Sequence, residues 1–134
     1  MIQKFRAWDK ENKRMIYPST DNIYFELTDD GINILDMSLE PFDDVFPHLD
    51  AVIMQSTGLF DKNGEEIYER DVLVSESGKV GYVAYLPQEA GFVVITNKGD
   101  YRLGHRNTNE GYDVANTHEI VDNIYECADG WVVQ

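Results

Sequence analysis

The sequence IYERDVLVSESGKVGYVAYLPQEAGFVVIT, residues 67–96, decides the fold. It contains short runs rich in valine, isoleucine, tyrosine and phenylalanine, and polar turn-forming clusters interrupt these runs. Such runs are typical of β-strands. They predict strands at about 66–74, 80–86 and 92–96, with turns at Ser77-Gly78 and at residues 87–91.

Two further runs extend this pattern, one from Val52 onward and one at about 118–125. Five short strands protect their edges and bury one face when the sheet curls up. We therefore predict a mostly β protein with an SH3-like small barrel or roll over residues 58–126. A flat β-sandwich is the alternative fold.

The N-terminal part continues the β pattern. Ile23, Phe25 and Leu27 alternate with polar residues and tyrosine, and Asp29-Asp30-Gly31 predicts a hairpin turn into residues 32–35. Two prolines in residues 36–50 exclude a long helix and predict a loop. We expect a single domain over 1–134, with β-hairpins in 1–57, the roll in 58–126 and a tail at 127–134.

A short internal similarity links two of the predicted hairpins. Residues 8–17 and residues 60–68 each contain an aromatic residue, then Asp-Lys, then an asparagine, then Ile-Tyr. Asn63-Gly64 in the second copy favours a tight turn, because this pair tolerates positive φ. We interpret the similarity as reused turn chemistry, since two copies are too few to indicate a repeat protein.

Composition and charge exclude several classes of protein. The chain has 134 residues, 43% of them hydrophobic, and a net charge of −14. Residues 1–17 carry five Lys or Arg and two acids, whereas residues 18–50 carry nine acids and neither Lys nor Arg. Such a surface repels phosphate backbones and anionic lipid, so we expect neither direct nucleic-acid binding nor membrane binding. With one cysteine, Cys127, and no apolar leader, we expect a cytoplasmic protein.

Three blocks of sequence carry a family resemblance. FRAWD at 5–9, MQSTGLFDKNG at 54–64 running into IYERD at 67–71, and NIYE at 123–126 together resemble the YopX-like family. The resemblance implies an origin in a bacteriophage or prophage of a Gram-positive host and an SH3-like C-terminal part, but no known activity. The family-motif residues, whose role is unknown, are Trp8, Thr57, Gly58, Asp61, Asn63, Gly64, Tyr68, Glu69, Asp71, Asn123 and Tyr125.

The chain departs from the family pattern at three places. Arg70 stands where the family usually has glycine, which raises the question of whether the chain can turn there. Asp122 replaces a glycine before Asn123, and residues 127–134 replace a tail that usually contains proline.

Metal and cofactor chemistry have no support in the sequence. His48, His105 and His118 lie far apart and in no zinc-binding pattern, so we expect surface or half-buried side chains. No acidic stretch has the calcium-loop spacing, and neither a nucleophile elbow nor a phosphate-binding glycine loop is present. We expect no cofactor and no metal.

Carboxylates and tyrosines remain as candidate functional groups. If 66–74 is one strand, Glu69 and Asp71 point to the same side and, with His118, could form the site of a hydrolase-type enzyme. With 25 acids in the chain, two on one solvent face are expected by chance, and we regard this as the stronger explanation of the pair. Of the eight tyrosines, some must lie at the edge of the core. If several are exposed together, they form a protein-binding surface, since tyrosine combines a large apolar area with a polar tip.

Our main hypothesis is a non-catalytic phage accessory protein that acts through protein contacts, either with a protein partner or with further copies of itself. One alternative is an acidic DNA mimic that inhibits a host DNA-binding protein. The enzyme is the third hypothesis.

Overall fold

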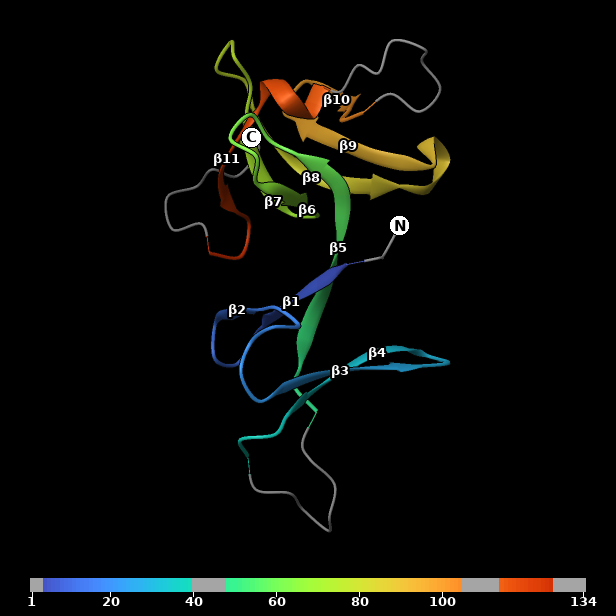
Figure 1. Ribbon diagram of the computed structural model, residues 1–134. Coiled ribbons are helices and arrows are strands. Elements are labelled where there is room, and N and C mark those ends of the chain that lie inside the picture. The colour runs from blue at the N-terminus through green and yellow to red at the C-terminus, as the bar shows by residue number, and fades with distance from the viewer. Residues whose placement is uncertain (1–3, 40–47, 105–113, 127–134) are drawn as a thin grey trace. The chain divides into compact units, whose positions relative to one another are not determined.

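The structure is a computed structural model that describes residues 4–39, 48–104 and 114–126 (Figure 1). The described chain is mostly β, as predicted. Its strands are β1 (Phe5–Asp9), β2 (Arg14–Ile16), β3 (Ile23–Thr28), β4 (Gly31–Asp36), β5 (Ala51–Phe60), β6 (Glu66–Tyr68), β7 (Asp71–Val74), β8 (Val80–Leu86), β9 (Gly91–Thr96), β10 (Gly99–Arg102) and β11 (Glu119–Asn123). Two short 3-10 helices, η1 (Pro87–Glu89) and η2 (Val114–Thr117), complete it.

The chain divides into two compact units, Met1–Gln55 and Ser56–Gln134. Strand β5 runs through the boundary: its first half pairs with β1 in unit 1, and its second half pairs with β6 in unit 2. Unit 1 also contains the β1–β2 hairpin and the separate β3–β4 hairpin. Its core consists of Ala7, Ile16 and Ile34, against which partly buried side chains of the β3–β4 hairpin and of residues 49–53 pack.

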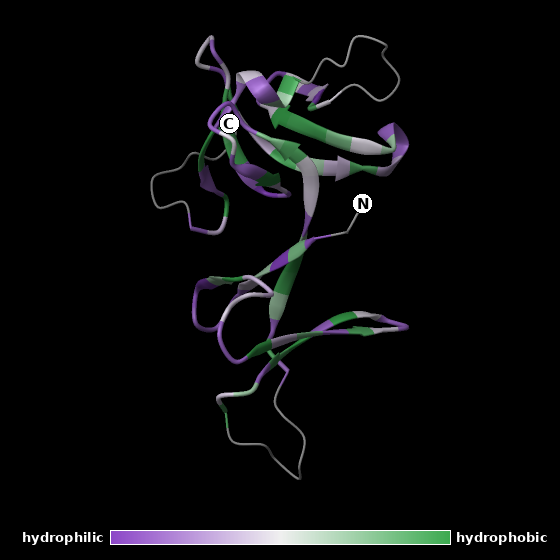
Figure 2. Ribbon diagram, viewed as in Figure 1, coloured by the Kyte–Doolittle hydropathy of each residue, from purple (hydrophilic) through white to green (hydrophobic). Residues whose placement is uncertain are grey.

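Unit 2 contains a five-stranded antiparallel sheet in the order β10-β9-β8-β7-β11. Strands β7 to β10 follow one another as a meander, and β11 returns to pair with β7. Figure 2 shows that the hydrophobic residues of this unit concentrate on these strands. Fully buried side chains such as Leu73, Val83, Val94 and Leu103 form its core. The sheet curls as a half-barrel, which is consistent with the predicted SH3-like roll.

Several predicted elements are confirmed. The hairpin at 23–28 and 31–36 turns at Asp29-Asp30, where the hydroxyl of Thr28 accepts the Asp30 amide and donates to the Gly31 carbonyl. Both copies of the internal similarity are hairpins. The strand predicted at 80–86 is β8, with the same bounds.

Two details of the strand prediction were wrong. The predicted strand 66–74 is two strands, β6 and β7, because the backbone turns at Arg70 with a φ of 71°. Strand β10 was missed, because Gly99–Arg102 is polar and lies at an edge of the sheet, where no apolar run marks it. Residues 40–47 of the predicted loop at 36–50 fall outside the described residues, as does the whole tail at 127–134 with Cys127.

Candidate functional site

Asp61 ties a turn to a distant strand. Its side chain is 4% exposed, and its Oδ1 atom accepts the amides of Asn63 and Glu65, both at 2.9 Å. Its Oδ2 atom accepts the amide of Ile120, on β11, at 3.0 Å. Asn63 and Gly64 supply the turn itself, and Gly64 has the positive φ of 83° predicted for this pair. Both carboxylate oxygens of Asp61 therefore hold the backbone of the protein.

Thr57 and Gly58 form an irregularity in β5. The pairing with β6 shifts register between Ser56 and Phe60, and Gly58 has a φ of 75°. The Thr57 hydroxyl donates to the Ile67 carbonyl at 2.7 Å and accepts the Leu59 amide. A β-bulge of this kind needs its freed backbone groups satisfied, and the Thr57 hydroxyl does this.

Asp71 closes the turn that separates β6 from β7. Its Oδ2 atom accepts the Tyr68 amide at 2.8 Å, and its side chain is buried. Arg70 lies at the apex, where its amide donates to Val83 and its carbonyl accepts from Ile124. The positive φ at Arg70 fits the glycine that the family resemblance implies there, because the left-handed conformation costs other residues free energy. The turn forms despite the arginine.

Asn123 fixes the end of β11. Its Oδ1 atom accepts the amides of Tyr125 and Glu126, and its Nδ2 atom donates to the Glu126 carboxylate. The side chain is 8% exposed. This arrangement is an Asx turn, in which a side chain takes the place of a backbone acceptor.

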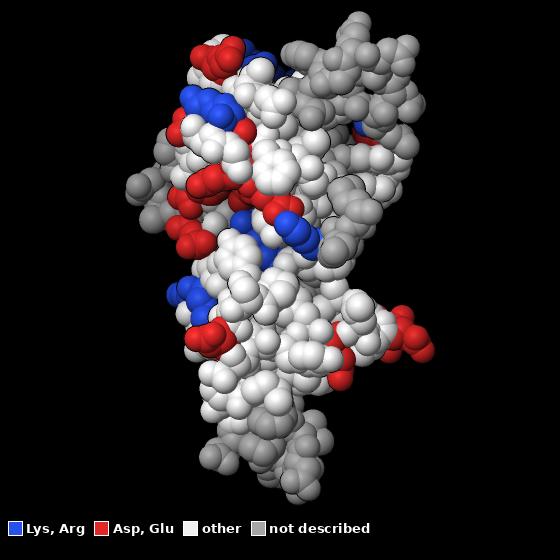
Figure 3. All heavy atoms as spheres, viewed as in Figure 1, with Lys and Arg blue, Asp and Glu red and all other residues white. Residues whose placement is uncertain are grey.

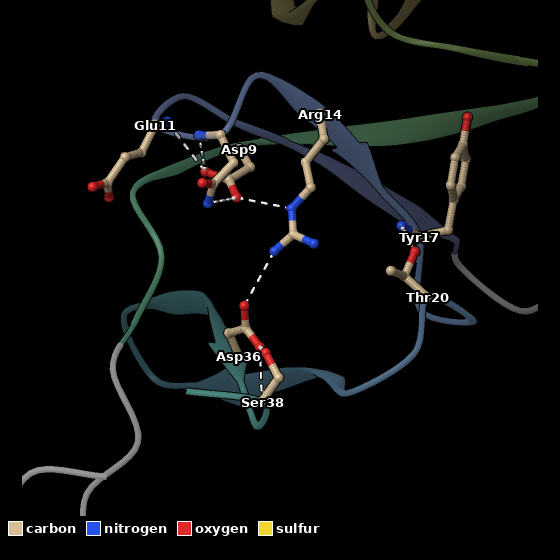
Figure 4. Close-up of polar contacts among 8 residues, drawn as sticks. Asp9, Glu11, Arg14, Tyr17, Thr20, Asp36 and Ser38 are labelled. Carbon is tan, nitrogen blue, oxygen red and sulfur yellow. Dashed lines mark hydrogen bonds and ion pairs between the residues drawn. The ribbon is translucent and has the colours of Figure 1, made fainter. Parts of the chain in front are cut away.

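Asp9 has the same role in unit 1 that Asp61 has in unit 2. Its Oδ1 atom accepts the amides of Glu11 and Asn12, and its Oδ2 atom accepts from Asn12 and from Nε of Arg14 (Figure 4). Arg14 also reaches Asp36 on β4, with Nη2 and Oδ2 3.2 Å apart. Asp9 and Arg14 therefore connect the β1–β2 hairpin to the β3–β4 hairpin. This cluster was not predicted from the sequence, although the Asp shared by the two similar segments marks it.

The surroundings of Asp9 and Asp36 favour their ionised forms. Burial alone would raise the pKa of Asp9, but the hydrogen bonds from Asn12 and Arg14 together outweigh it and lower the pKa. The hydroxyl of Ser38 is the largest influence on Asp36, and with the Ser38 amide and Arg14 it lowers that pKa against the opposing effect of burial. Both carboxylates belong to an internal ion cluster.

His118 is buried, with 3% of its surface exposed, so the expectation of a surface or half-buried side chain was wrong for it. Its Nδ1 atom lies 3.0 Å from the Val114 carbonyl, which can only accept, so Nδ1 carries the hydrogen. Its Nε2 atom then accepts from the Tyr101 hydroxyl at 2.6 Å. Burial lowers the pKa of His118 and raises that of Tyr101, so both groups are neutral at pH 7.

The carboxylates of the enzyme hypothesis do not meet His118. Because the chain turns at Arg70, Glu69 and Asp71 are not successive same-side residues of one strand, and that interpretation was wrong. In the β7–β11 pair, Asn123 lies opposite Asp71 and Glu119 lies opposite Val74. His118 precedes Glu119, so it lies at the other end of β7 from Asp71. Among the described residues, no group of three His, Cys, Asp or Glu side chains is arranged to hold a metal ion.

The exposed apolar side chains concentrate in one stretch of unit 1. Three of the described tyrosines are exposed: Tyr24 at 57%, Tyr85 at 43% and Tyr17 at 38%. Leu27, at 79%, is the most exposed large apolar side chain among the described residues, and Met37 and Leu39 are exposed as well. Residues 17–39 thus combine exposed apolar groups with an absence of Lys and Arg.

The acids of residues 18–50 are partly engaged within the chain. Asp36 pairs with Arg14, and Asp50 pairs with Lys10 at 3.6 Å. On the face that Figure 3 shows, acidic and basic side chains lie next to one another at several places, and uncharged side chains cover much of the rest. Within the part of the chain that the structure describes, no helix is long and apolar enough to span a membrane.

Comparisons with known proteins agree on one family. The family model described as YopX protein matches residues 4–129. Protein EF1440 from Enterococcus faecalis has a similar structure, with 28% identity, a TM-score of 0.60 and coverage of 94% of this chain and 95% of that chain. YopX from Bacillus subtilis shows the same fold at 17% identity, with a TM-score of 0.56 and coverage of 92% and 94%. A search of curated proteins found no match.

Proposed function

This chain belongs to the YopX family, and from that premise we propose that it is a non-catalytic accessory protein that works through contacts with other protein molecules. The observation that carries this proposal is the use of the motif side chains. The acceptor oxygens of Asp61, Asp71 and Asn123, and the hydroxyl of Thr57, bind the chain's own backbone. Side chains engaged in this way shape turns and a bulge, which leaves the outer surface as the place for function.

Exposed apolar side chains support the same proposal. Tyr24, Leu27 and Met37 of unit 1 lose water contact only if another molecule covers them. Tyrosine is the residue type that most often anchors protein interfaces together with tryptophan and arginine. The surface of unit 1 around residues 17–39 therefore fits a protein partner better than it fits a small substrate.

The two alternatives have weaker support. A DNA mimic needs free carboxylates spaced like phosphates, and the pairing of Asp36 and Asp50 with basic residues of the same chain counts against that spacing. A hydrolase needs its acid and base within reach of one substrate, and the register of β7 and β11 separates Asp71 from His118.

The proposal extends to a bacteriophage or prophage origin in a Gram-positive host. The solved relatives from Enterococcus faecalis and Bacillus subtilis support a bacterial host of this type. The position of the gene settles the origin: we expect it among phage genes, and a location among housekeeping genes without phage neighbours would contradict it.

Capture and mass measurement test the function. The intact chain and a variant with Asp21, Glu26, Asp29 and Asp30 changed to their amides are used to capture proteins from a bacterial lysate. In parallel, light scattering after size exclusion gives the mass of the pure protein. We expect either a stoichiometric partner or a stable oligomer. A monomer that captures no protein above background would overturn the proposal.

A further inference from the structure

The β3–β4 hairpin of unit 1, residues Ile23–Asp36, is here called the arm. Figure 1 shows it as a two-stranded ribbon that extends from the rest of unit 1. Its base is anchored, because Ile34 is in the core and Asp36 binds Arg14. Its tip is fixed by the hydrogen bonds of Thr28. An isolated hairpin is marginally stable in water, so these anchors keep the arm formed before any partner binds.

The two faces of the arm differ in chemistry. Phe25 and Leu27 lie on the face that packs on the core near the base, where Phe25 pairs with Ile34. That apolar face continues beyond the core, since Leu27 near the tip is 79% exposed. The other face carries Tyr24, which is 57% exposed, and Glu26. Figure 2 shows hydrophobic colour along both strands and hydrophilic colour at the tip.

The outer edge of β3 has no strand beside it within the described residues. The arm is a sheet of two strands in the order β3-β4, and β4 has an isolated bridge to His48 on its other side. An edge strand presents amide and carbonyl groups at the spacing of a sheet, and an extended segment of another chain can bind there as a further strand. At six residues, β3 offers an edge about 20 Å long.

Charge decides which strand fits this edge. Between Ile23 and Asp36 the charged residues are Glu26, Asp29, Asp30 and Asp36, with neither Lys nor Arg. On the face that Figure 3 shows, the charged side chains at the projecting tip of the arm are acidic. Two β3 edges from two copies would bring like charges together, which opposes pairing. A segment with cationic side chains is attracted by the same charges, which favours its pairing with β3.

We propose that the outer edge of β3 binds an extended segment of a partner protein in which cationic and apolar residues alternate. The apolar residues lie beside Phe25 and Leu27, and the cationic residues lie beside Tyr24 and Glu26 on the other face. A cation near Glu26 gains Coulomb attraction, and one over the Tyr24 ring gains a cation–π contact. This inference rests on the proposed function, for which it specifies the site and the class of partner.

The test uses the full chain and a capped peptide of about six residues in which lysine and valine alternate, to match the length of β3. We expect its binding to shift the backbone amide resonances of residues 23–28, and to weaken as salt is raised. A peptide with glutamine in place of lysine separates charge from strand pairing. A peptide N-methylated at alternate residues removes the donors of the added strand.

Matched variants of the protein locate the site. Glu26→Lys reverses the charge next to the proposed strand, and Leu27→Ser removes an exposed apolar contact; neither residue is in the core. We expect each substitution to weaken the binding of the lysine–valine peptide about tenfold or more. The control is Asp100→Lys on β10, an edge strand of the five-stranded sheet in unit 2, and it leaves the affinity unchanged.

The inference would be overturned by equal binding of the lysine and glutamine peptides, by resonance shifts outside the arm, or by an affinity unchanged by Glu26→Lys. Light scattering that shows an oligomer with the β3 amides protected would also overturn it, because a second copy would then be the occupant. These failures differ from failure of the proposed function. If lysate capture of a partner persists when the arm is changed, the contact function stands and the arm is not its site.

Discussion

Replacing Asp61 tests whether the motif residues hold the fold together. In Asp61→Ala, three amides lose their acceptor: those of Asn63, Glu65 and Ile120. The amides of Asn63 and Glu65 belong to exposed residues and can bind water instead, so we assign them together about 1 kcal/mol. The Ile120 amide, 59 residues away in sequence, loses a partly buried bond to a carboxylate, which costs about 2 kcal/mol.

The expected loss in the free energy of unfolding is therefore about 3 kcal/mol. This is a large part of the total stability of a typical domain, which is about 5–15 kcal/mol. Urea unfolding followed by far-ultraviolet circular dichroism measures it. Asp61→Asn keeps one acceptor and so loses less. The control, Asp100→Ala, removes an exposed acid on β10 and changes the free energy by less than about 0.5 kcal/mol.

Two results would refute this reasoning. One is an Asp61→Ala variant as stable as the control. The other is a destabilised variant whose Ile120 amide exchanges hydrogen as slowly as in the wild type, since the lost stability would then have another source.

Three further predictions follow from the buried ion and turn clusters. Because burial lowers the pKa of His118, its neutral form stabilises the fold above pH 6.5, and this contribution disappears as the pH falls through the lowered folded pKa. The free energy of unfolding measured with urea should therefore decrease from about pH 7 to about pH 5 in the wild type, and it should decrease less in His118→Gln. Arg14→Met removes the cation between Asp9 and Asp36, so NMR titration should show both carboxyl pKa values rising, and acid unfolding should begin at higher pH; unchanged values would contradict the cluster. Arg70→Gly relieves the left-handed conformation and should raise the free energy of unfolding by up to about 1 kcal/mol, whereas Arg70→Val should lower it.

The sequence predicted the elements whose signals are local. Alternation in residues 23–28 and the Asp-Asp-Gly turn specify the arm, because one face must reach the core and the turn needs residues that tolerate tight geometry. The run of valine and tyrosine at 80–86 likewise predicted β8, because such residues favour strands. The Asn63-Gly64 turn was also visible, since Gly64 has the predicted positive φ.

Features that depend on distant residues were not predictable. The residues of this chain gave no turn signal at Arg70, and only the glycine implied by the family resemblance raised the question of a turn there. The turn is held by the Asp71 carboxylate and by backbone bonds to Val83 and Ile124. The burial of His118 depends on Tyr101, which lies on the missed strand β10. The bond from Ile120 to Asp61 connects residues whose proximity only the folded sheet creates.

The central claim is that the motif residues hold the structure while the arm makes the contact. The most direct measurement is the affinity of the lysine–valine peptide for Asp61→Asn and for Glu26→Lys, at a temperature where both variants are folded. The account predicts wild-type affinity for Asp61→Asn and affinity about tenfold or more weaker for Glu26→Lys. Loss of binding in Asp61→Asn with full binding in Glu26→Lys would contradict it.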